Sequence, residues 1–285
     1  MSKCSLKLFF TLFADDSTLT YTSSYSINHA RKIIEKELKK VLVWLAANKL
    51  IINLNKTHLM VFTNSRRYNS EKSITITAND QIISEITETK FLGVILDNKL
   101  VWDAHIKHIS NKMSKSVAIL KLLKHTFPTS ALKTIYHSLI YPYFNYCNLI
   151  WGSAASTHLE SLTLIQKKCI RIISKVGYYD HTEPLFNEHK VLTVPKIYDY
   201  NCAKFIFQCY NNNTYSNFKN RLKTNSEFHE YNTRSKNLLR KPIVRLSKFT
   251  HSFLYNGIEI WNRLPVSVKI VKSFNSFKIL TKKLI

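Results

Sequence analysis

Two adjacent aspartates follow an apolar segment near the start of the chain. Asp15 and Asp16 come directly after Phe13–Ala14, and Leu6–Phe13 is apolar on both of its alternating faces. Phosphoryl-transfer enzymes that use two divalent cations need carboxylates held close together. A tight turn between strands holds such a pair rigidly, although an Asp-Asp pair also suits an ordinary turn. We therefore expect a hairpin whose tip carries a candidate metal site.

The segments around these aspartates predict an α+β region. The apolar character of both faces of Leu6–Phe13 is typical of a buried central strand, and Thr18–Thr22 alternates between apolar and polar residues as the returning strand. From about Ile27 to Asn48 apolar residues recur every three or four positions, which predicts an amphipathic helix. Further strands are expected at Leu59–Thr63, Ser73–Thr77 and Phe91–Leu96.

The helical period dominates after Trp102, so the fold class is α+β followed by mainly α. From Lys219 onward 15 basic residues stand against three acidic ones among scattered aromatic residues, and we expect a small, loosely packed basic module there. The predicted helices cover Ile106–Leu120, Thr129–Ile140, Thr157–Lys175 and Lys196–Tyr210.

The charge balance favours a polyanionic partner. Lys and Arg number 42 against 18 Asp and Glu, a formal net charge of +24. Such a charge attracts nucleic acid through long-range fields and released counterions, and a membrane surface is the alternative polyanion. No apolar run approaches the roughly 18 to 20 residues of a membrane-spanning helix, so we predict no membrane partner.

The cysteines and the first residues bear on metal binding and compartment. Five cysteines are widely spaced and form no C-x-x-C pair, so we predict neither a disulfide framework nor zinc. The short apolar run Leu8–Ala14 is followed by Asp15–Asp16 where a signal peptide would carry small residues. We therefore expect an intracellular protein, in the nucleus or the cytoplasm.

An ordered set of motifs resembles the reverse transcriptases of non-LTR retrotransposons, of the LINE and jockey type. The resemblance runs from about Leu6 to the end of the chain. Its pieces, in order, are Phe13–Ala14–Asp15–Asp16; Trp44–Leu45, Asn48–Lys49–Leu50, Asn53, Lys56–Thr57 and Met60; Phe91–Leu92–Gly93–Val94, Leu96–Asp97, Trp102 and His105; Gln166–Lys167–Lys168 and Arg171; and Asn232–Thr233–Arg234, Ser252–Phe253, Trp261–Asn262 and Leu264–Pro265.

The resemblance implies a partial palm at 1–103, a helical thumb at 104–212 and a basic C-terminal region at 213–285. Asp15 would be a metal ligand for Mg²⁺ or Mn²⁺, with Asp16 as its more peripheral partner. Lys56 would protonate the leaving pyrophosphate, unless it is an ordinary solvated loop lysine. RNA template and DNA primer are the implied partners. Phe91, Leu92 and Gly93 would lie under the primer terminus, unless they form an ordinary strand end.

The thumb helices of the family would contact the sugar-phosphate backbone of the template–primer duplex through basic side chains. The alternative for any one of these side chains is a solvated outer face. The candidate residues are Lys112, Lys115, Lys167, Lys168 and Arg171.

The front of the sequence departs from the family pattern. Reverse transcriptases take a further metal-binding aspartate from an earlier palm strand, and only 14 residues, none acidic, precede Asp15. We therefore expect the C-terminal part of an RNA-directed DNA polymerase that does not polymerise DNA alone. Two alternatives stay open, a non-catalytic RNA- or DNA-binding remnant and an inert relic of a truncated element.

Overall fold

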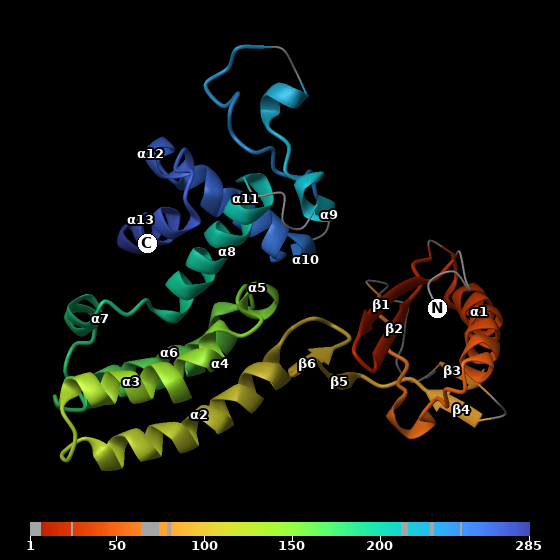
Figure 1. Cartoon of the computed structure of the whole chain (residues 1–285), viewed down its shortest axis with the longest axis horizontal. Coiled ribbons are helices and arrows are strands. Elements are labelled where there is room, and N and C mark those ends of the chain that lie inside the picture. Colours follow the sequence, from red (N-terminus) through yellow and green to blue (C-terminus); the bar gives the residue numbers. More distant parts are fainter. Residues whose placement is uncertain are drawn as a thin grey trace. The chain divides into compact units, whose positions relative to one another are not determined.

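The chain is α+β and divides into two compact units, residues 1–100 and 101–285. Figure 1 shows their elements. The computed structural model describes residues 7–23, 25–63, 74–78, 81–211, 216–228, 231–245 and 247–285.

The described residues of the first unit form three separate two-stranded antiparallel sheets beside one long helix. Its elements are β1 (Phe9–Phe13), β2 (Asp16–Thr20), α1 (Ile27–Ala47), the short 3₁₀ helix η1 (Leu54–Lys56), β3 (Thr75–Ala78), β4 (Gln81–Ser84), β5 (Glu88–Phe91) and β6 (Val94–Asp97).

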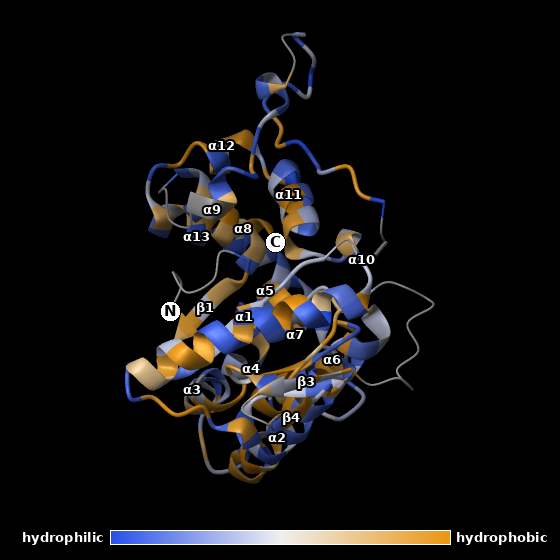
Figure 2. Cartoon of the chain, turned by 90° about the vertical axis from the view of Figure 1, so that its right-hand side faces the viewer, coloured by the Kyte–Doolittle hydropathy of each residue, from blue (hydrophilic) through white to orange (hydrophobic). Residues whose placement is uncertain are grey.

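The helix α1 confirms the predicted amphipathic pattern, and its apolar face makes the core of the unit. Leu38 packs with Ile76, Ala78 and Ile83 of β3 and β4, and Leu19 of β2 packs against this cluster. Figure 2 shows hydrophilic and hydrophobic residues following one another along α1. The hairpin β1–β2 is thus held by the same core as α1.

Three predicted strands differ from the structure. β1 pairs with β2 alone among the described residues, and Phe9 and Phe13 are 70% and 61% exposed, so the expected buried central strand is wrong. Leu59–Thr63 makes a single bridge, from Leu59 to Glu85, and Leu59 packs against the core of the unit. The strand expected at Phe91–Leu96 is instead a hairpin, and Ser73 of the other predicted strand lies outside the described residues.

The end of α1 explains part of the motif around Trp44. The side-chain amide of Asn48 donates to the carbonyl of Trp44 at 2.8 Å. Lys49 follows in the left-handed conformation with φ 57°, and the amide of Leu50 reaches back to the carbonyl of Leu45 at 2.9 Å. This is a Schellman ending, in which glycine is the usual left-handed residue.

Replacing Lys49 with glycine is expected to stabilise the first unit by about 1 kcal/mol, because glycine removes the steric cost of the left-handed backbone. Lys39→Gly, at an exposed position inside the same helix, should destabilise the unit by about 1 kcal/mol. Urea titration followed by circular dichroism measures both. A Lys49→Gly variant less stable than wild type would contradict the assigned helix ending.

The second unit is almost wholly helical. The predicted second, third and fourth helices are confirmed as α3, α6 and α8, and the first lies within α2. None of the helices in the described ranges is long and apolar enough to cross a membrane. The elements are α2 (Asp103–Leu123), α3 (Thr129–Leu139), α4 (Tyr141–Asn145), α5 (Asn148–Trp151), α6 (Ser156–Ile173), α7 (Glu183–His189), α8 (Val194–Asn211), α9 (Ser216–Lys219), the 3₁₀ helix η2 (Asn225–Glu227), α10 (Ser247–Thr250), α11 (Phe253–Arg263), α12 (Val266–Lys269) and α13 (Phe274–Leu284).

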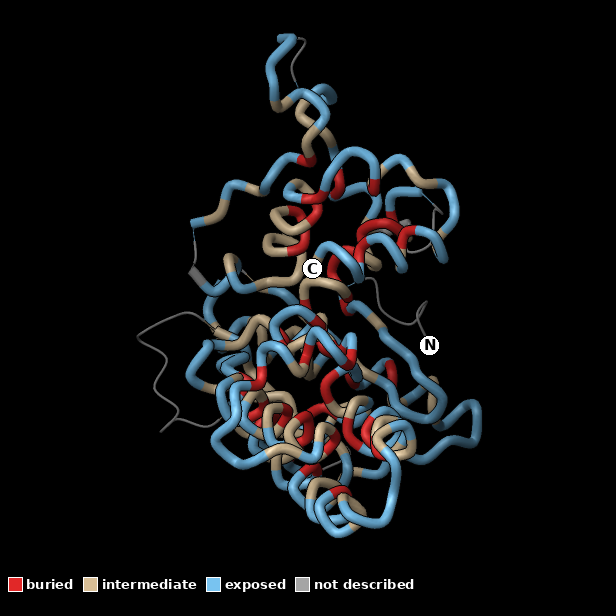
Figure 3. Tube along the Cα trace, turned by 90° about the vertical axis from the view of Figure 1, so that its left-hand side faces the viewer, coloured by how far each residue is buried: buried red, intermediate tan, exposed pale blue. Residues whose placement is uncertain are grey.

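The basic C-terminal residues are better packed than the sequence predicts. Phe207 of α8, Ile258 of α11 and Phe277 of α13 are fully buried in one cluster. The rings of Phe207 and Phe277 stack with centroids 4.2 Å apart. Figure 3 shows the buried residues along these helices. The apolar residues between the charges therefore build a core with α8, and the expectation of loose packing is wrong.

Candidate metal-binding hairpin and nucleic-acid interface

The tip of the β1–β2 hairpin presents both aspartates. Phe13 pairs with Asp16, so Ala14 and Asp15 form a two-residue turn. Ala14 adopts φ 51°, a left-handed conformation that is uncommon for a residue other than glycine. Asp15 and Asp16 are both exposed. The predicted hairpin and the position of the pair at its tip are therefore present in the structure.

The two faces of this hairpin differ. Side chains alternate along a strand, so Asp16 lies on the opposite face from Leu19, which packs on the core. Asp16 shares its face with its direct partner Phe13 and with Phe9, and both rings are exposed. The hairpin thus has one face on the core of the unit and one open face that carries a carboxylate.

Two adjacent exposed carboxylates suit a hard divalent cation. Mg²⁺ in nucleotide-handling sites is held by one or two carboxylates and keeps its other positions for water and phosphate oxygens. The donor set of Asp15 and Asp16 fits that pattern. A cation held there would neutralise charge that develops on a transferring phosphoryl group. Within the described ranges, no group of three or more His, Cys, Asp or Glu side chains could hold a metal ion.

Lys56 ends η1 and is exposed. The hydroxyl of Thr57 donates to the carbonyl of Asn53 at 2.8 Å, which fixes the turn around the lysine. Leu54 and Leu59, on either side, pack against the cluster that also holds the hairpin. A common core therefore positions the backbone of Lys56 and of the aspartate hairpin.

Phe91, Leu92 and Gly93 lie at the end of β5 and in the β5–β6 turn. Phe91 pairs with Val94, and the two turn residues have φ 45° and 84°. Positive φ at both positions is typical of the tight hairpin turn that suits strand twist. The three residues predicted as a primer grip thus form the tip of a second hairpin, with Gly93 exposed.

The helices α2 and α6 of the second unit run side by side in the same direction. Oδ1 of Asp103 lies 3.1 Å from Nδ1 of His158 at their starts. The hydroxyls of Ser110 and Ser161 are 3.4 Å apart further along. Near the ends, Nζ of Lys124 donates to the carbonyl of residue 176 at 3.0 Å. Figure 1 shows the two helices with α3 against them.

A basic strip follows the exposed line where these helices meet. In a helix, residues three, four, seven or eleven apart share a face. Lys107 and Lys121 therefore lie on the flank of α2 that carries Ser110, and Lys168 lies on the flank of α6 that carries Ser161. All three lysines are exposed. We call Lys107, Lys121 and Lys168 the α2–α6 strip, and it extends for on the order of 20 Å.

The other predicted binding residues lie elsewhere on these helices. Lys112 is two residues from Ser110 and so falls on the far flank of α2, while Lys115 points to the outer side. Lys167 is half-buried on α6, away from α2. Nε of Arg171 donates to the carbonyl of Asp180 at 2.8 Å, so this guanidinium also holds the loop that follows α6. The sequence does not show that α6 lies beside α2, and for this reason it does not separate Lys107 and Lys121 from the other lysines of α2.

Gln166, the first residue of the Gln-Lys-Lys motif, is fully buried. Its Nε2 donates to the hydroxyl of Tyr136 at 3.1 Å and to the carbonyl of Leu192 at 2.8 Å. Its Oε1 accepts from the amide of Val194 at 2.9 Å. The side chain therefore joins α6 to α3 and to the start of α8, and the motif combines a core residue with basic surface residues.

The chain is similar in sequence to several known proteins. The RNA-directed DNA polymerase from mobile element jockey of Drosophila funebris is 28% identical over 190 residues, which cover 66% of this chain. The polymerase of the same name from Drosophila melanogaster is 29% identical over 66% of this chain. The probable RNA-directed DNA polymerase from transposon BS of Drosophila melanogaster is 26% identical over a similar share.

The chain spans about a fifth of the length of these curated relatives, 20 to 21%. No family model matches the chain. No solved structure matches it either. Across about two thirds of its residues, the chain is similar in sequence to RNA-directed DNA polymerases of jockey-type non-LTR retrotransposons. This similarity confirms the resemblance predicted from its motifs.

Proposed function

We propose that this chain is part of an RNA-directed DNA polymerase and contributes its carboxylate hairpin and a surface for the template–primer duplex. The observation that carries the proposal is the open face of the β1–β2 hairpin, with Asp15 and Asp16 at its tip and a packed core behind it. The similarity to jockey-type polymerases supports the same reading. The reaction would be nucleotidyl transfer to a DNA primer on an RNA template.

The residues predicted for the first unit each have a place in this proposal. Asp15 and Asp16 hold the divalent cation, which their exposed carboxylates fit. Lys56 gives a proton to the departing pyrophosphate, since an exposed ammonium can both pair with phosphate and release a proton. The Phe91–Leu92–Gly93 turn supports the primer terminus, where glycine permits close approach of the backbone.

The duplex would be held along the α2–α6 strip. Three exposed lysines border one line between parallel helices, and serine hydroxyls lie between them as further partners for phosphate. Phosphate contacts of this kind bind without sequence preference and weaken steeply with salt. A net charge of +24 strengthens the attraction to either strand.

Salt-titrated binding to a labelled RNA–DNA duplex tests this interface. Lys121→Ala combined with Lys168→Ala should lower the slope of log affinity against log salt concentration by about two and weaken low-salt binding about tenfold or more. Lys32→Ala combined with Lys36→Ala removes the same charge from the exposed face of α1 and serves as the control.

Lys112→Ala combined with Lys115→Ala tests the two lysines of α2 that the sequence predicts as duplex contacts but that lie outside the strip. If the α2–α6 strip is the duplex site, this pair should change the salt slope by less than about one. A larger loss from the Lys112–Lys115 pair than from the Lys121–Lys168 pair would move the duplex to the far flank of α2. If every pair of substitutions, including the α1 control, caused the same small loss of duplex affinity, the duplex would be attracted by overall charge alone. That result would contradict a defined site.

A second candidate function is nucleic-acid binding without catalysis. The α2–α6 strip favours it, because the strip lies wholly within the second unit and involves no carboxylate hairpin. Under this reading, Asp15→Asn would leave duplex affinity unchanged in the presence and the absence of Mg²⁺. Under the polymerase reading, Mg²⁺ should strengthen duplex binding in wild type and lose that effect in Asp15→Asn.

A further inference from the structure

A loop between α9 and α10 leaves the helical body of the second unit and returns to it. Its ends are fixed in the core, because Leu222 and Leu239 are buried beside α8 and α11. The side chain of Asn262 accepts from the amide of Leu239 at 3.0 Å and donates to its carbonyl at 2.9 Å. Figure 3 shows the loop as mostly exposed above this buried base.

The two arms of the loop are joined to each other. The amide of Arg240 donates to the carbonyl of Lys223 at 2.8 Å, and the amide of Asn225 donates to the carbonyl of Leu238 at 3.0 Å. Further out, the amide of Ser226 donates to the carbonyl of Lys236 at 3.0 Å. The described residues 222–228 and 231–241 thus form a ribbon of two arms, and hydrogen bonds within the chain hold its shape.

The ribbon carries an excess of exposed positive charge. Two acidic residues stand in this part of the sequence, and Glu230 lies outside the described residues. The carboxylate of Glu227 accepts from the amide of Thr224 at 2.8 Å and closes a capping box. Lys241 is occupied as well, since its ammonium lies 2.6 Å from the carboxylate of Glu259 on α11. The other exposed cations of the ribbon are Lys223, Arg234, Lys236 and Arg240.

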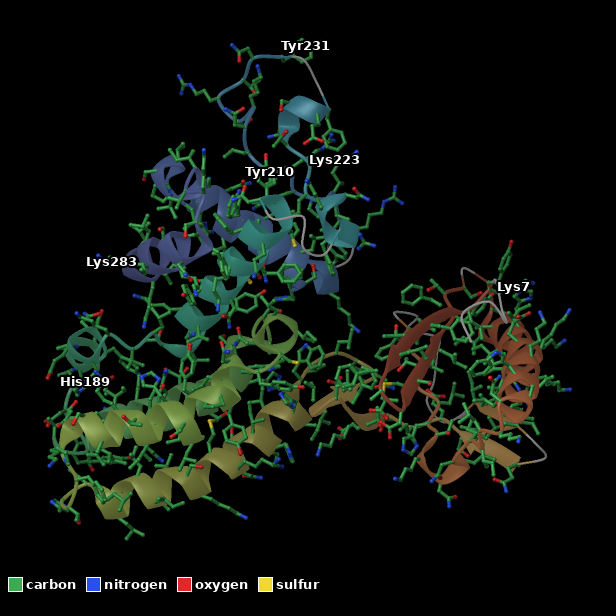
Figure 4. The ribbon with its side chains drawn as sticks, viewed as in Figure 1. Lys7, His189, Tyr210, Lys223, Tyr231 and Lys283 are labelled. Atoms are coloured by element: carbon green, nitrogen blue, oxygen red, sulfur yellow. The ribbon has the colours of Figure 1, made fainter. Side chains whose placement is uncertain are left out.

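Exposed aromatic rings lie among these cations. Phe228 is 52% exposed, with the guanidinium of Arg240 4.0 Å and the ammonium of Lys223 6.0 Å from its ring centroid. Tyr231 is 77% exposed. Figure 4 places Lys223 toward the base of the ribbon and Tyr231 at its far end. The ribbon therefore carries two exposed rings, one of which lies directly beside two of its cations.

We propose that this ribbon binds an unpaired nucleic-acid strand, distinct from the duplex on the α2–α6 strip. Aromatic faces stack with bases that are unstacked, and bases in a duplex are already stacked on one another. The cations beside Phe228 would pair with the phosphates on either side of a stacked base. An acidic protein surface would use the same cations but would gain little from two exposed rings.

The test compares three labelled probes, oligouridine, oligothymidine of equal length and an RNA–DNA duplex. Phe228→Ala combined with Tyr231→Ala should weaken single-strand binding about tenfold or more and change duplex binding less than about twofold. The matched control, Tyr25→Ala combined with Tyr179→Ala, removes two other exposed rings and should change neither. A larger loss for oligouridine assigns the ribbon to RNA, and a larger loss for oligothymidine assigns it to DNA.

The charges are tested in parallel. Lys223→Ala combined with Arg240→Ala should lower the salt slope for single strands by about two, and Lys282→Ala combined with Lys283→Ala should lower it by less than about one. If a ring variant melts earlier, Phe228→Leu keeps the apolar contact and still removes the stacking face. Unchanged single-strand affinity, or an equal loss for duplex and single strand, would overturn the proposal. The strip variants, which affect the duplex, keep this result separate from the proposed function.

Discussion

Gln166→Leu is expected to lower the free energy of unfolding of the second unit by about 3 to 5 kcal/mol. The leucine would fill a similar volume but leave three polar groups without their partner: the buried hydroxyl of Tyr136, the buried amide of Val194 and the part-buried carbonyl of Leu192. Each buried group that loses its hydrogen bond costs about 1 to 3 kcal/mol. Urea denaturation followed by circular dichroism measures the loss.

Two companion variants separate the hydrogen bonds from a general effect on α6. Tyr136→Phe alone removes one bond and should cost about 1 kcal/mol, and it should cost less in the Gln166→Leu background, where that bond is already absent. Lys168→Leu changes the exposed face of the same helix and should stay within about 0.5 kcal/mol of wild type. A loss below about 1 kcal/mol for Gln166→Leu would contradict the anchoring role.

Gly152→Ala is expected to destabilise the second unit by about 3 kcal/mol or more. A Cβ atom at this position would lie 2.5 Å from the carbonyl oxygen of Asn148 and 2.6 Å from Cδ2 of Tyr198, so α5 could no longer approach α8. Because the first of these atoms is backbone and the second belongs to a buried ring, neither moves cheaply. Thermal unfolding in a calorimeter reports the change.

Gly177→Ala is the matched control. A Cβ atom there meets first the carboxylate of Asp180, at 3.3 Å, which is a side-chain group, and Gly177 is exposed. We expect Gly177→Ala to unfold within about 0.5 kcal/mol of wild type. If Gly152→Ala changed the stability as little as Gly177→Ala, this result would contradict the close approach of α5 and α8.

The helices could be predicted from sequence because their signal is local. A periodic apolar face suffices for α1, α3 and α6, and their bounds agree with the structure within a few residues. The pairing and burial of the strands depend on neighbouring segments that cannot be identified from the sequence. Phe9 and Phe13 look like residues of a buried strand, yet β1 pairs only with β2 among the described residues and its outer face is exposed.

The candidate site shows the same division. Two short strand-like segments and the Asp-containing turn between them predicted the aspartate hairpin, because a hairpin is a local feature. Which lysines lie along the line where α2 meets another helix depends on the neighbour of α2, and that is a tertiary property. Gln166 and Lys168 belong to one short motif, yet one is an anchor in the core and the other an exposed cation. Sequence periodicity separates such roles only when the buried face is already known.

The central claim is that Asp15 and Asp16 bind a divalent cation on the open face of the hairpin. Mn²⁺ added to the isotope-labelled chain should broaden the backbone amide signals of residues 14–17 before those of other segments, because Mn²⁺ substitutes for Mg²⁺ at carboxylate oxygens. Asp15→Asn combined with Asp16→Asn should abolish this broadening, and Asp97→Asn should leave it intact. Broadening that persists in the double variant, or that appears first elsewhere, would contradict the claim.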